Sequence, residues 1–356
     1  MKKILNGLLI FVPVAGVAAV WHFSAIFLFC TSALAIIPLA GLLGEATESL
    51  AVSAGPRIGG LLNATFGNAA ELIIAFIAVR AGELTLVAAS LIGSILGNIL
   101  LVLGMAILFG GLRFGTQRFN QEQAGIDASL LFLAAIAIAV PSLFNAAIEP
   151  DTARVEDLSM ATSVVMLVIY VLATGYSLLV WNGEKSDRQE NFREAEAAPR
   201  HWGPKTSLLV LTLSVGTLAV LSEFLVSTVE PVTKQLGFST FFVGIIIIPI
   251  IGNVAEHVVA VEMALKNRLE LTLSIALGSS LQIALFVGPL IVLLSSFLGH
   301  PFALEFNQFE LIALTSASVI GAFVAMDGKS NWLEGAMLLA VYLVLSIAFF
   351  FLPAKL

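Results

Sequence analysis

Long uninterrupted apolar runs dominate the chain, and a membrane-spanning helix needs about 20 such residues. The runs are continuous rather than alternating, which excludes a β-barrel. Two of the longest stretches, around residues 61–110 and 236–298, are rich in glycine and could contain broken helices. The pattern predicts eleven spans, at residues 4–21, 23–43, 61–80, 84–110, 126–144, 158–181, 206–228, 236–263, 269–298, 308–326 and 332–352.

Composition supports this interpretation. The 356 residues are 59% hydrophobic and 12% charged, whereas a soluble domain is about 25% charged. So few charges could not cover a surface in water, which excludes a soluble enzyme. The net charge of −7 has the wrong sign for a nucleic-acid partner, and a single cysteine, Cys30, excludes internal disulfides. We expect an all-α, multi-pass integral membrane protein whose main partner is the lipid bilayer.

The positions of Lys and Arg predict the orientation, because cytoplasmic loops carry an excess of them. With the N-terminus in the cytoplasm, 13 of the 17 basic residues fall on the inner side of the cell membrane. An odd number of spans then places the C-terminus outside. The first apolar run, at residues 4–20, lacks the small-residue cleavage site of a signal peptide, so we interpret it as a retained helix.

An internal repeat organises the chain. A shift of 185 residues places Gly67, Asn68 and Glu71 on Gly252, Asn253 and Glu256. Each repeat holds five spans, an odd number, so the second repeat must be inverted relative to the first. Inverted repeats are typical of secondary transporters, whose sites lie near the bilayer midplane. The expected parts are an extra N-terminal helix (1–22), a first repeat (23–181, spans 2–6), an acidic cytoplasmic linker (182–204) and a second repeat (205–356, spans 7–11).

The repeat places one carboxylate inside span 3 and one inside span 8. Glu71 and Glu256 are functional candidates by default, because a charge inside the membrane is costly. Asn68 and Asn253 each lie three residues earlier, on the same helix face as the glutamate. Carboxylate and amide oxygens suit a hard cation such as Ca²⁺, so we expect the two glutamates to be its ligands.

Glycines and small polar residues accompany this pair. Gly67 and Gly252 allow close backbone approach or local unwinding. Further polar positions in spans 4 and 9 are path-lining candidates, although helix packing is the alternative explanation for each; they are Ser90, Ser94, Asn98, Ser279 and Gln282. His257 follows Glu256 but points about 100° away around the helix, so it either relays protons or is a packed, hydrogen-bonded residue.

Two neighbouring buried carboxylates cannot both remain charged and empty. Protons or a divalent cation must neutralise them, and metal binding displaces protons. The two ions therefore compete for one site, which is the basis of an antiporter.

Three more acids could provide access from the cytoplasm. Glu48 and Glu223 occupy matching places in the two repeats and are expected near the inner ends of spans 2 and 7, with Glu45 as an alternative or an addition. Interfacial charges without a transport role are the competing interpretation.

These residues resemble the calcium/proton exchanger (CAX) family of the calcium/cation antiporter superfamily. The matching stretches are residues 67–73 and 252–257, with flanking matches at 56–65, 93–98, 278–282 and 327–332. The resemblance implies eleven spans, a cytoplasmic segment between spans 6 and 7, and Ca²⁺ transport driven by protons. It assigns Glu71 and Glu256 as the carriers, and the motif Asn and Gly residues with Ser94, Asn98, Ser279 and Gln282 as the path. It implies no cofactor, and the absence of long regulatory extensions looks prokaryotic.

Three competing functions remain open at this point. A sodium/calcium exchanger shares the repeat design but has different polar residues in its motifs. A cation channel is the second alternative. Inverted repeats that share a pair of carboxylates favour stoichiometric exchange over a channel. An intramembrane enzyme is not expected, because the chain has neither an HExxH zinc pair nor a GxSxG elbow. A homo-oligomer is compatible with the sequence.

Overall fold

The computed structural model describes residues 6–147, 152–180 and 202–352. Nearly all of the predicted linker, 182–204, lies outside the described residues, as do the basic residues Lys2, Lys3 and Lys355 at the two ends.

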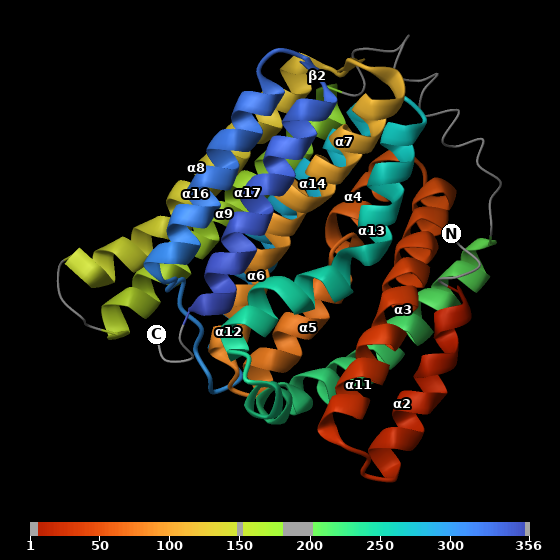
Figure 1. The fold of residues 1–356 in the computed structure, drawn as a ribbon, viewed down its shortest axis with the longest axis vertical. Coiled ribbons are helices and arrows are strands. Elements are labelled where there is room, and N and C mark those ends of the chain that lie inside the picture. Colours follow the sequence, from red (N-terminus) through yellow and green to blue (C-terminus); the bar gives the residue numbers. More distant parts are fainter. Residues whose placement is uncertain (1–5, 148–151, 181–201, 353–356) are drawn as a thin grey trace.

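Helices make up almost the whole of the described chain (Figure 1). The first half contains η1 (Leu8–Ile10), α2 (Phe11–Val20), α3 (Ala25–Ala54), α4 (Pro56–Phe66), α5 (Ala69–Arg80), α6 (Leu84–Leu96), η2 (Gly97–Val102), α7 (Leu103–Phe114), α8 (Gln121–Ala147) and α9 (Thr152–Val180). The second half contains α11 (Pro204–Leu236), α12 (Thr240–Phe242), η3 (Val243–Ile247), α13 (Ile248–Leu265), α14 (Leu269–Gln282), η4 (Ile283–Val287), α15 (Gly288–Ser295), α16 (Gln308–Ala325) and α17 (Trp332–Phe351).

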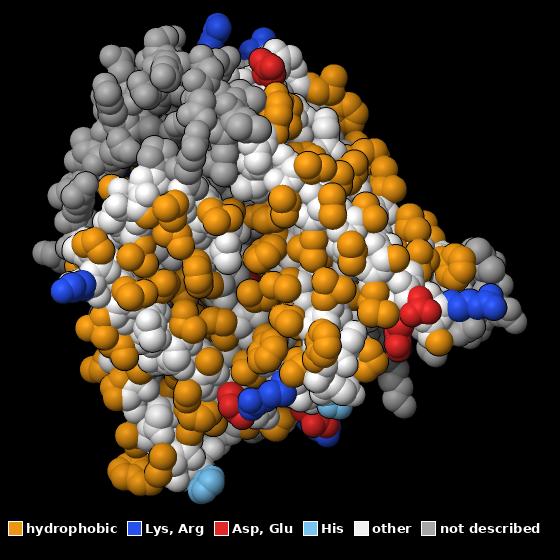
Figure 2. Space-filling view, turned by 180° about the vertical axis from the view of Figure 1, so that it is seen from behind, with side chains coloured by type: hydrophobic (Ala, Val, Ile, Leu, Met, Phe, Trp, Pro, Cys, Tyr) orange, Lys and Arg blue, Asp and Glu red, His pale blue; other side chains and the backbone are white. Residues whose placement is uncertain are grey.

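The predicted helical membrane architecture is confirmed at the level of its class. Within the described residues, nine helices are long and apolar enough to cross a membrane. The pair α4 and α5, bent by 40°, would make a tenth, and Leu8–Val20 is a shorter apolar helix. Figure 2 shows hydrophobic side chains over most of one face, with charged side chains mainly toward its borders. The count of eleven spans stays a prediction.

The helices are broken in both glycine-rich regions. Gly67 and Asn68 separate α4 from α5, and π-helical segments interrupt three long helices as η2, η3 and η4. Residues 98–102 of η2, shifted by 185, become 283–287, the bounds of η4. π-Helical segments inside α-helices frequently lie at functional sites, and η2 and η4 occupy matching sequence positions in the two halves of the chain.

Helices α2, α3 and α11 lie together along one side of the molecule in Figure 1, with the other helices grouped beside them. Helix α3 also packs closely on α13, because a Cβ placed on Gly41 would lie 3.5 Å from that of Ala255. The site described below is built between α5, α6, α13 and α14.

A short strand pair ties two loops together at one end of the bundle. Strands β1 (Gln117–Arg118) and β2 (Lys329–Ser330) pair antiparallel, with Arg118 opposite Lys329. Gln117 donates to the Ala264 carbonyl oxygen at 2.9 Å, so the end of α13 joins the same region. Several basic residues predicted to be cytoplasmic therefore share one end, although the side of the membrane stays a prediction.

Candidate ion-binding site

The two motif asparagines make reciprocal bonds to serines in the opposite half of the chain. The hydroxyl of Ser279 on α14 donates to Oδ1 of Asn68 at 2.8 Å. Nδ2 of Asn253 on α13 donates to the hydroxyl of Ser94 on α6 at 3.3 Å. Asn68 with Asn253, and Ser94 with Ser279, are the pairs related by 185 residues. Four predicted site residues are thus joined in two matching pairs, with the donor and acceptor roles reversed between them.

Asn98 and Gln282 extend the network around Asn68. Nδ2 of Asn98 donates to the Ser279 hydroxyl at 3.0 Å, and Nδ2 of Asn68 donates to Oε1 of Gln282 at 2.6 Å. Both bonds join the two halves of the chain. A Cβ on Gly67 would lie 2.7 Å from the Asn63 carbonyl oxygen and 2.8 Å from Oε1 of Gln282, so a larger residue there would force the backbone to shift.

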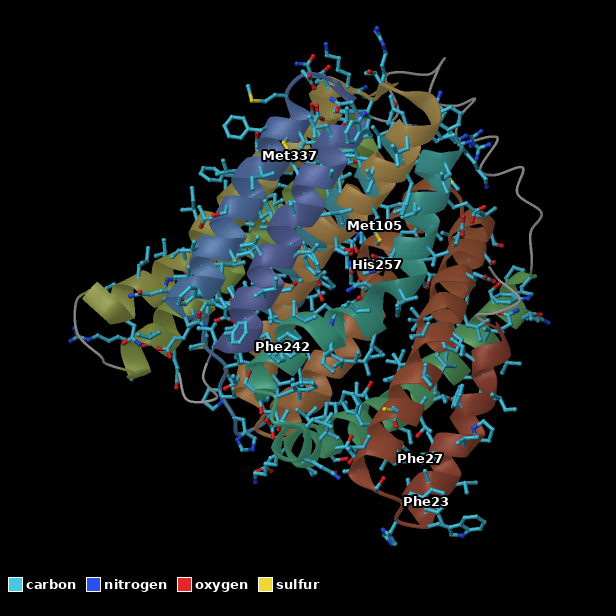
Figure 3. All side chains as sticks on the ribbon, in the orientation of Figure 1. Phe23, Phe27, Met105, Phe242, His257 and Met337 are labelled. Carbon is cyan, nitrogen blue, oxygen red and sulfur yellow. The ribbon has the colours of Figure 1, made fainter. Side chains whose placement is uncertain are left out.

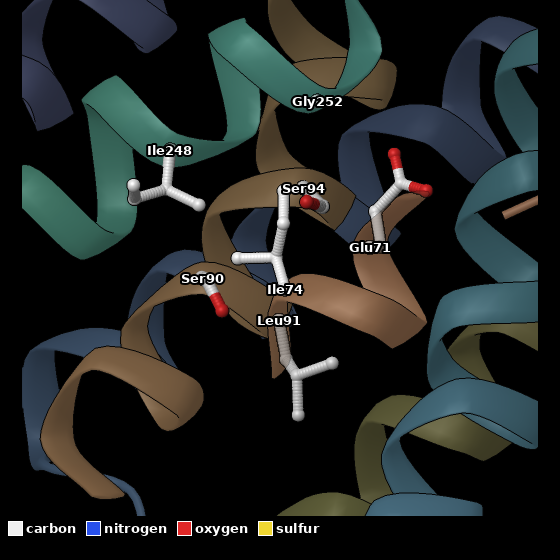
Figure 4. Close-up of a pocket in the computed structure, with 7 residues that line it drawn as sticks. All are labelled: Glu71, Ile74, Ser90, Leu91, Ser94, Ile248 and Gly252. Carbon is white, nitrogen blue, oxygen red and sulfur yellow. The ribbon is translucent and has the colours of Figure 1, made fainter. Parts of the chain in front are cut away.

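Glu71 lies in the first turn of α5 and points toward the second motif. A Cβ on Gly252 would be 3.4 Å from its Oε1 atom. Figure 4 shows its carboxylate rising from α5 beside Ser94 and the α13 backbone. A cavity of about 10 Å³ adjoins it, lined by Glu71, Ile74, Ser90, Leu91, Ser94, Ile248 and Gly252. That volume is close to what one water molecule requires.

Glu256 lies one turn beyond Gly252 on α13, and Gly252 itself adjoins the Glu71 carboxylate. The Oε2 atom of Glu256 is buried without a hydrogen-bond partner, as is Oδ1 of Asn253. Buried polar atoms normally have partners. Two unpartnered acceptor oxygens, one turn apart on one helix face, therefore have capacity for a cation or a proton.

His257 is buried on α13 and takes no part in the asparagine–serine contacts. Its Nε2 atom has no hydrogen-bond partner. Figure 3 places His257 near the middle height of the molecule, at a level similar to Met105 of α7. The sequence leaves its role open between a proton relay and a packed side chain, and both remain open.

The available donors are mostly oxygens. Within the described part of the chain, no group of three or more His, Cys, Asp or Glu side chains could hold a metal. The site instead combines two carboxylates with amide and hydroxyl groups, a set that suits a hard cation and not a soft one.

Glu223, predicted to belong to the cytoplasmic relay, pairs with Arg80, and its role in a relay stays a prediction. Its Oε1 atom accepts a hydrogen bond from Arg80 at 2.9 Å, and Arg80 is the last residue of α5. Glu48 is exposed near the other end of the bundle, close to where α3 ends and α4 begins. Glu45 is half-buried on α3.

Some lining residues carry no sequence signal. Ile74 and Ile248 border the cavity, but they are indistinguishable from lipid-facing residues in an apolar run. Tyr170 on α9 reaches the break before Glu71, with its hydroxyl 2.7 Å from the Ala64 carbonyl oxygen. A tyrosine hydroxyl inside a span was the available signal, because it must find a partner there.

The fold and site define a multi-pass membrane protein whose two halves together build a buried, oxygen-rich site. The family model described as sodium/calcium exchanger protein matches residues 24–179 and again residues 206–351. The chain belongs to that family.

Relatives and a solved structure agree with this assignment. A Ca(2+)/H(+) antiporter of Aphanothece halophytica is 43% identical, covering 99% of this chain and 97% of the relative. The Ca(2+)/H(+) antiporter ChaA of Bacillus subtilis (strain 168) is 42% identical, covering 96% and 97%. The structure of native YfkE has a TM-score of 0.85 and 39% identity, covering 99% of this chain and 100% of that one. The resemblance to the calcium/proton exchangers is confirmed.

Proposed function

We propose that this protein exchanges Ca²⁺ for protons across the membrane, with Glu71 and Glu256 carrying either load. The observation that carries the proposal is the buried, unpartnered carboxylate oxygen of Glu256, one turn from Gly252, which adjoins the Glu71 carboxylate. In the described part of the chain no Lys or Arg side chain forms an ion pair with either glutamate; Arg80, Lys234 and Lys266 pair with Glu223, Glu230 and Glu262 instead. A bound proton or Ca²⁺ must then neutralise the two glutamates, because the described residues supply no positive side chain there.

A difference between two matching helix crossings supports alternating access. At Gly93 on α6, a Cβ would overlap the carbonyl oxygen of Ile245 and lie 2.7 Å from Pro249 Cγ. At Gly278, the matching residue on α14, nothing lies within 4 Å. One crossing is closed and its counterpart is open. Exchanging the two arrangements would close one side of the site and open the other.

Proton coupling is favoured over sodium coupling by two considerations. The relatives at 43% and 42% identity are named Ca(2+)/H(+) antiporters. Buried carboxylates also bind protons directly, and one Ca²⁺ replaces up to two protons when the pair is neutralised.

The test uses purified protein in sealed liposomes with the membrane potential clamped. Uptake of radioactive Ca²⁺ is measured with either a pH gradient or a Na⁺ gradient. We expect uptake to follow the pH gradient. Uptake that follows only the Na⁺ gradient would identify a sodium-coupled exchanger, and single-channel currents would identify a channel.

A further inference from the structure

Tyr170 contacts the helix break that precedes the first motif. Helix α4 ends at Phe66, so the backbone N–H of Asn68 does not donate a helical hydrogen bond to the Ala64 carbonyl oxygen. That carbonyl accepts a hydrogen bond from the Tyr170 hydroxyl at 2.7 Å. A carbonyl freed within a membrane must find another donor, and α9 supplies it from outside the four helices that build the site.

The second repeat satisfies the matching carbonyl in a different way. Ala64 shifted by 185 residues is Pro249. The Pro249 carbonyl accepts from the side chain of Asn253, its own motif asparagine, at 3.0 Å. In the first repeat, Tyr170 occupies that acceptor. The Asn68 side chain donates to Gln282 of α14 instead, at 2.6 Å.

The tyrosine ring also contacts the other half of the site. It stacks on Phe286 of η4, with ring centroids 5.2 Å apart and an interplanar angle of 23°. Segment η4 begins immediately after Gln282. Tyr170 therefore contacts both the backbone that leads to Asn68 and the segment that follows Gln282.

We infer that Tyr170 is a positioning residue for the ion site. The Tyr170 hydroxyl donates to the Ala64 carbonyl, so the side-chain amide of Asn68 donates to Gln282 instead. This bond fixes the position of Glu71, one turn further along the chain. The inference rests on the proposed function for its consequence in transport. Without the hydroxyl, the Asn68 side chain would turn back to the Ala64 carbonyl, as Asn253 does to Pro249.

The first test compares Tyr170→Phe with Tyr176→Phe. Tyr176 lies on the same helix and is 55% exposed, so its variant controls for loss of a hydroxyl on α9. An interhelical hydrogen bond in a membrane contributes about threefold to tenfold in an equilibrium. We expect Tyr170→Phe to raise the KM for Ca²⁺ by about that factor, with little change in maximal rate, and Tyr176→Phe to leave both unchanged. A lower maximal rate at unchanged KM would overturn the inference.

A double-mutant cycle with Gln282→Met provides a second test. If Tyr170 acts through the Asn68–Gln282 bond, that bond is already lost in Tyr170→Phe. Gln282→Met should then raise KM much less in the Tyr170→Phe background than in wild type. Additive effects on KM would show that Tyr170 does not act through Asn68.

Hydrogen exchange of residues 64–72 separates this inference from the proposed function. We expect faster exchange there in Tyr170→Phe than in wild type or Tyr176→Phe. Unchanged exchange would overturn the positioning role even if wild type exchanges Ca²⁺ for protons. If hydrogen exchange is faster in Tyr170→Phe but the wild type transports no Ca²⁺, the positioning role is supported and the proposed function is refuted.

Discussion

Ser279 is the central residue of the polar network, because its hydroxyl both accepts and donates. It accepts from Asn98 at 3.0 Å and donates to Asn68 at 2.8 Å. Ser279→Ala would leave two buried amide groups each short of a partner, and an unsatisfied buried group costs about 1–3 kcal/mol. We expect a corresponding loss of stability, measured by thermal unfolding in detergent. Ser129→Ala is the control, since Ser129 is exposed and bonds only within its own helix; equal effects of the two substitutions would contradict this account.

Glu83, in the turn between α5 and α6, gives a pH-dependent prediction. Burial, followed by repulsion from Glu230, raises the pKa of Glu83 above its ordinary 4.5. The folded state thus favours protonated Glu83, and stability is lost as rising pH ionises it. Glu83→Gln should raise the melting temperature at pH 8, with the gain disappearing as the pH falls below 4.5. A gain that is the same at both pH values would refute the assignment.

At the scale of elements, the helix crossings at Gly93 and Gly278 predict opposite effects on stability when the glycine is replaced by alanine. Gly93→Ala overlaps the backbone of η3, and overpacking of this kind costs about 1–3 kcal/mol. Gly278→Ala fits the open space beside α14 and should preserve or raise the melting temperature. It should nevertheless slow transport, because the proposed alternating access requires this crossing to close in the other state.

The matched control for the glycine substitutions is Gly216→Ala, at an exposed position of α11 with nothing within 4 Å. Melting temperatures and initial rates of Ca²⁺ uptake are measured for all three variants. Wild-type transport by Gly278→Ala would contradict the exchange of open and closed crossings.

The elements themselves were largely predictable from sequence. Membrane helices need continuous apolar runs, and the intramembrane glutamates Glu71 and Glu256 stand out against them. The break at Gly67 was also foreshadowed by its residue type, because glycine allows local unwinding. The π-helical segments were not, because their residues, as in Ile283–Val287, are ordinary helix formers and the change lies in hydrogen-bond pairing alone.

At the scale of the whole molecule, the sequence identified related positions better than their places in space. Glu48 and Glu223 correspond in the repeat, yet Glu223 pairs with Arg80 at the opposite end from Glu48. The contact of Tyr170 with Ala64 was equally hidden, because 106 residues separate them. The reciprocal asparagine–serine bonds followed from neither spacing nor composition; they depend on how the halves pack.

The central claim is that Glu71 and Glu256 carry both ions, and substituting each glutamate tests it most directly. Ca²⁺ uptake driven by a pH gradient is compared between wild type, Glu71→Gln, Glu256→Gln and the control Glu262→Gln. Glu262 lies on the same helix as Glu256 but is paired with Lys266 at 2.7 Å and half exposed. We expect each site variant to fall to the level of empty liposomes while the control retains wild-type uptake. Gradient-driven uptake that survives in either site variant would contradict the account.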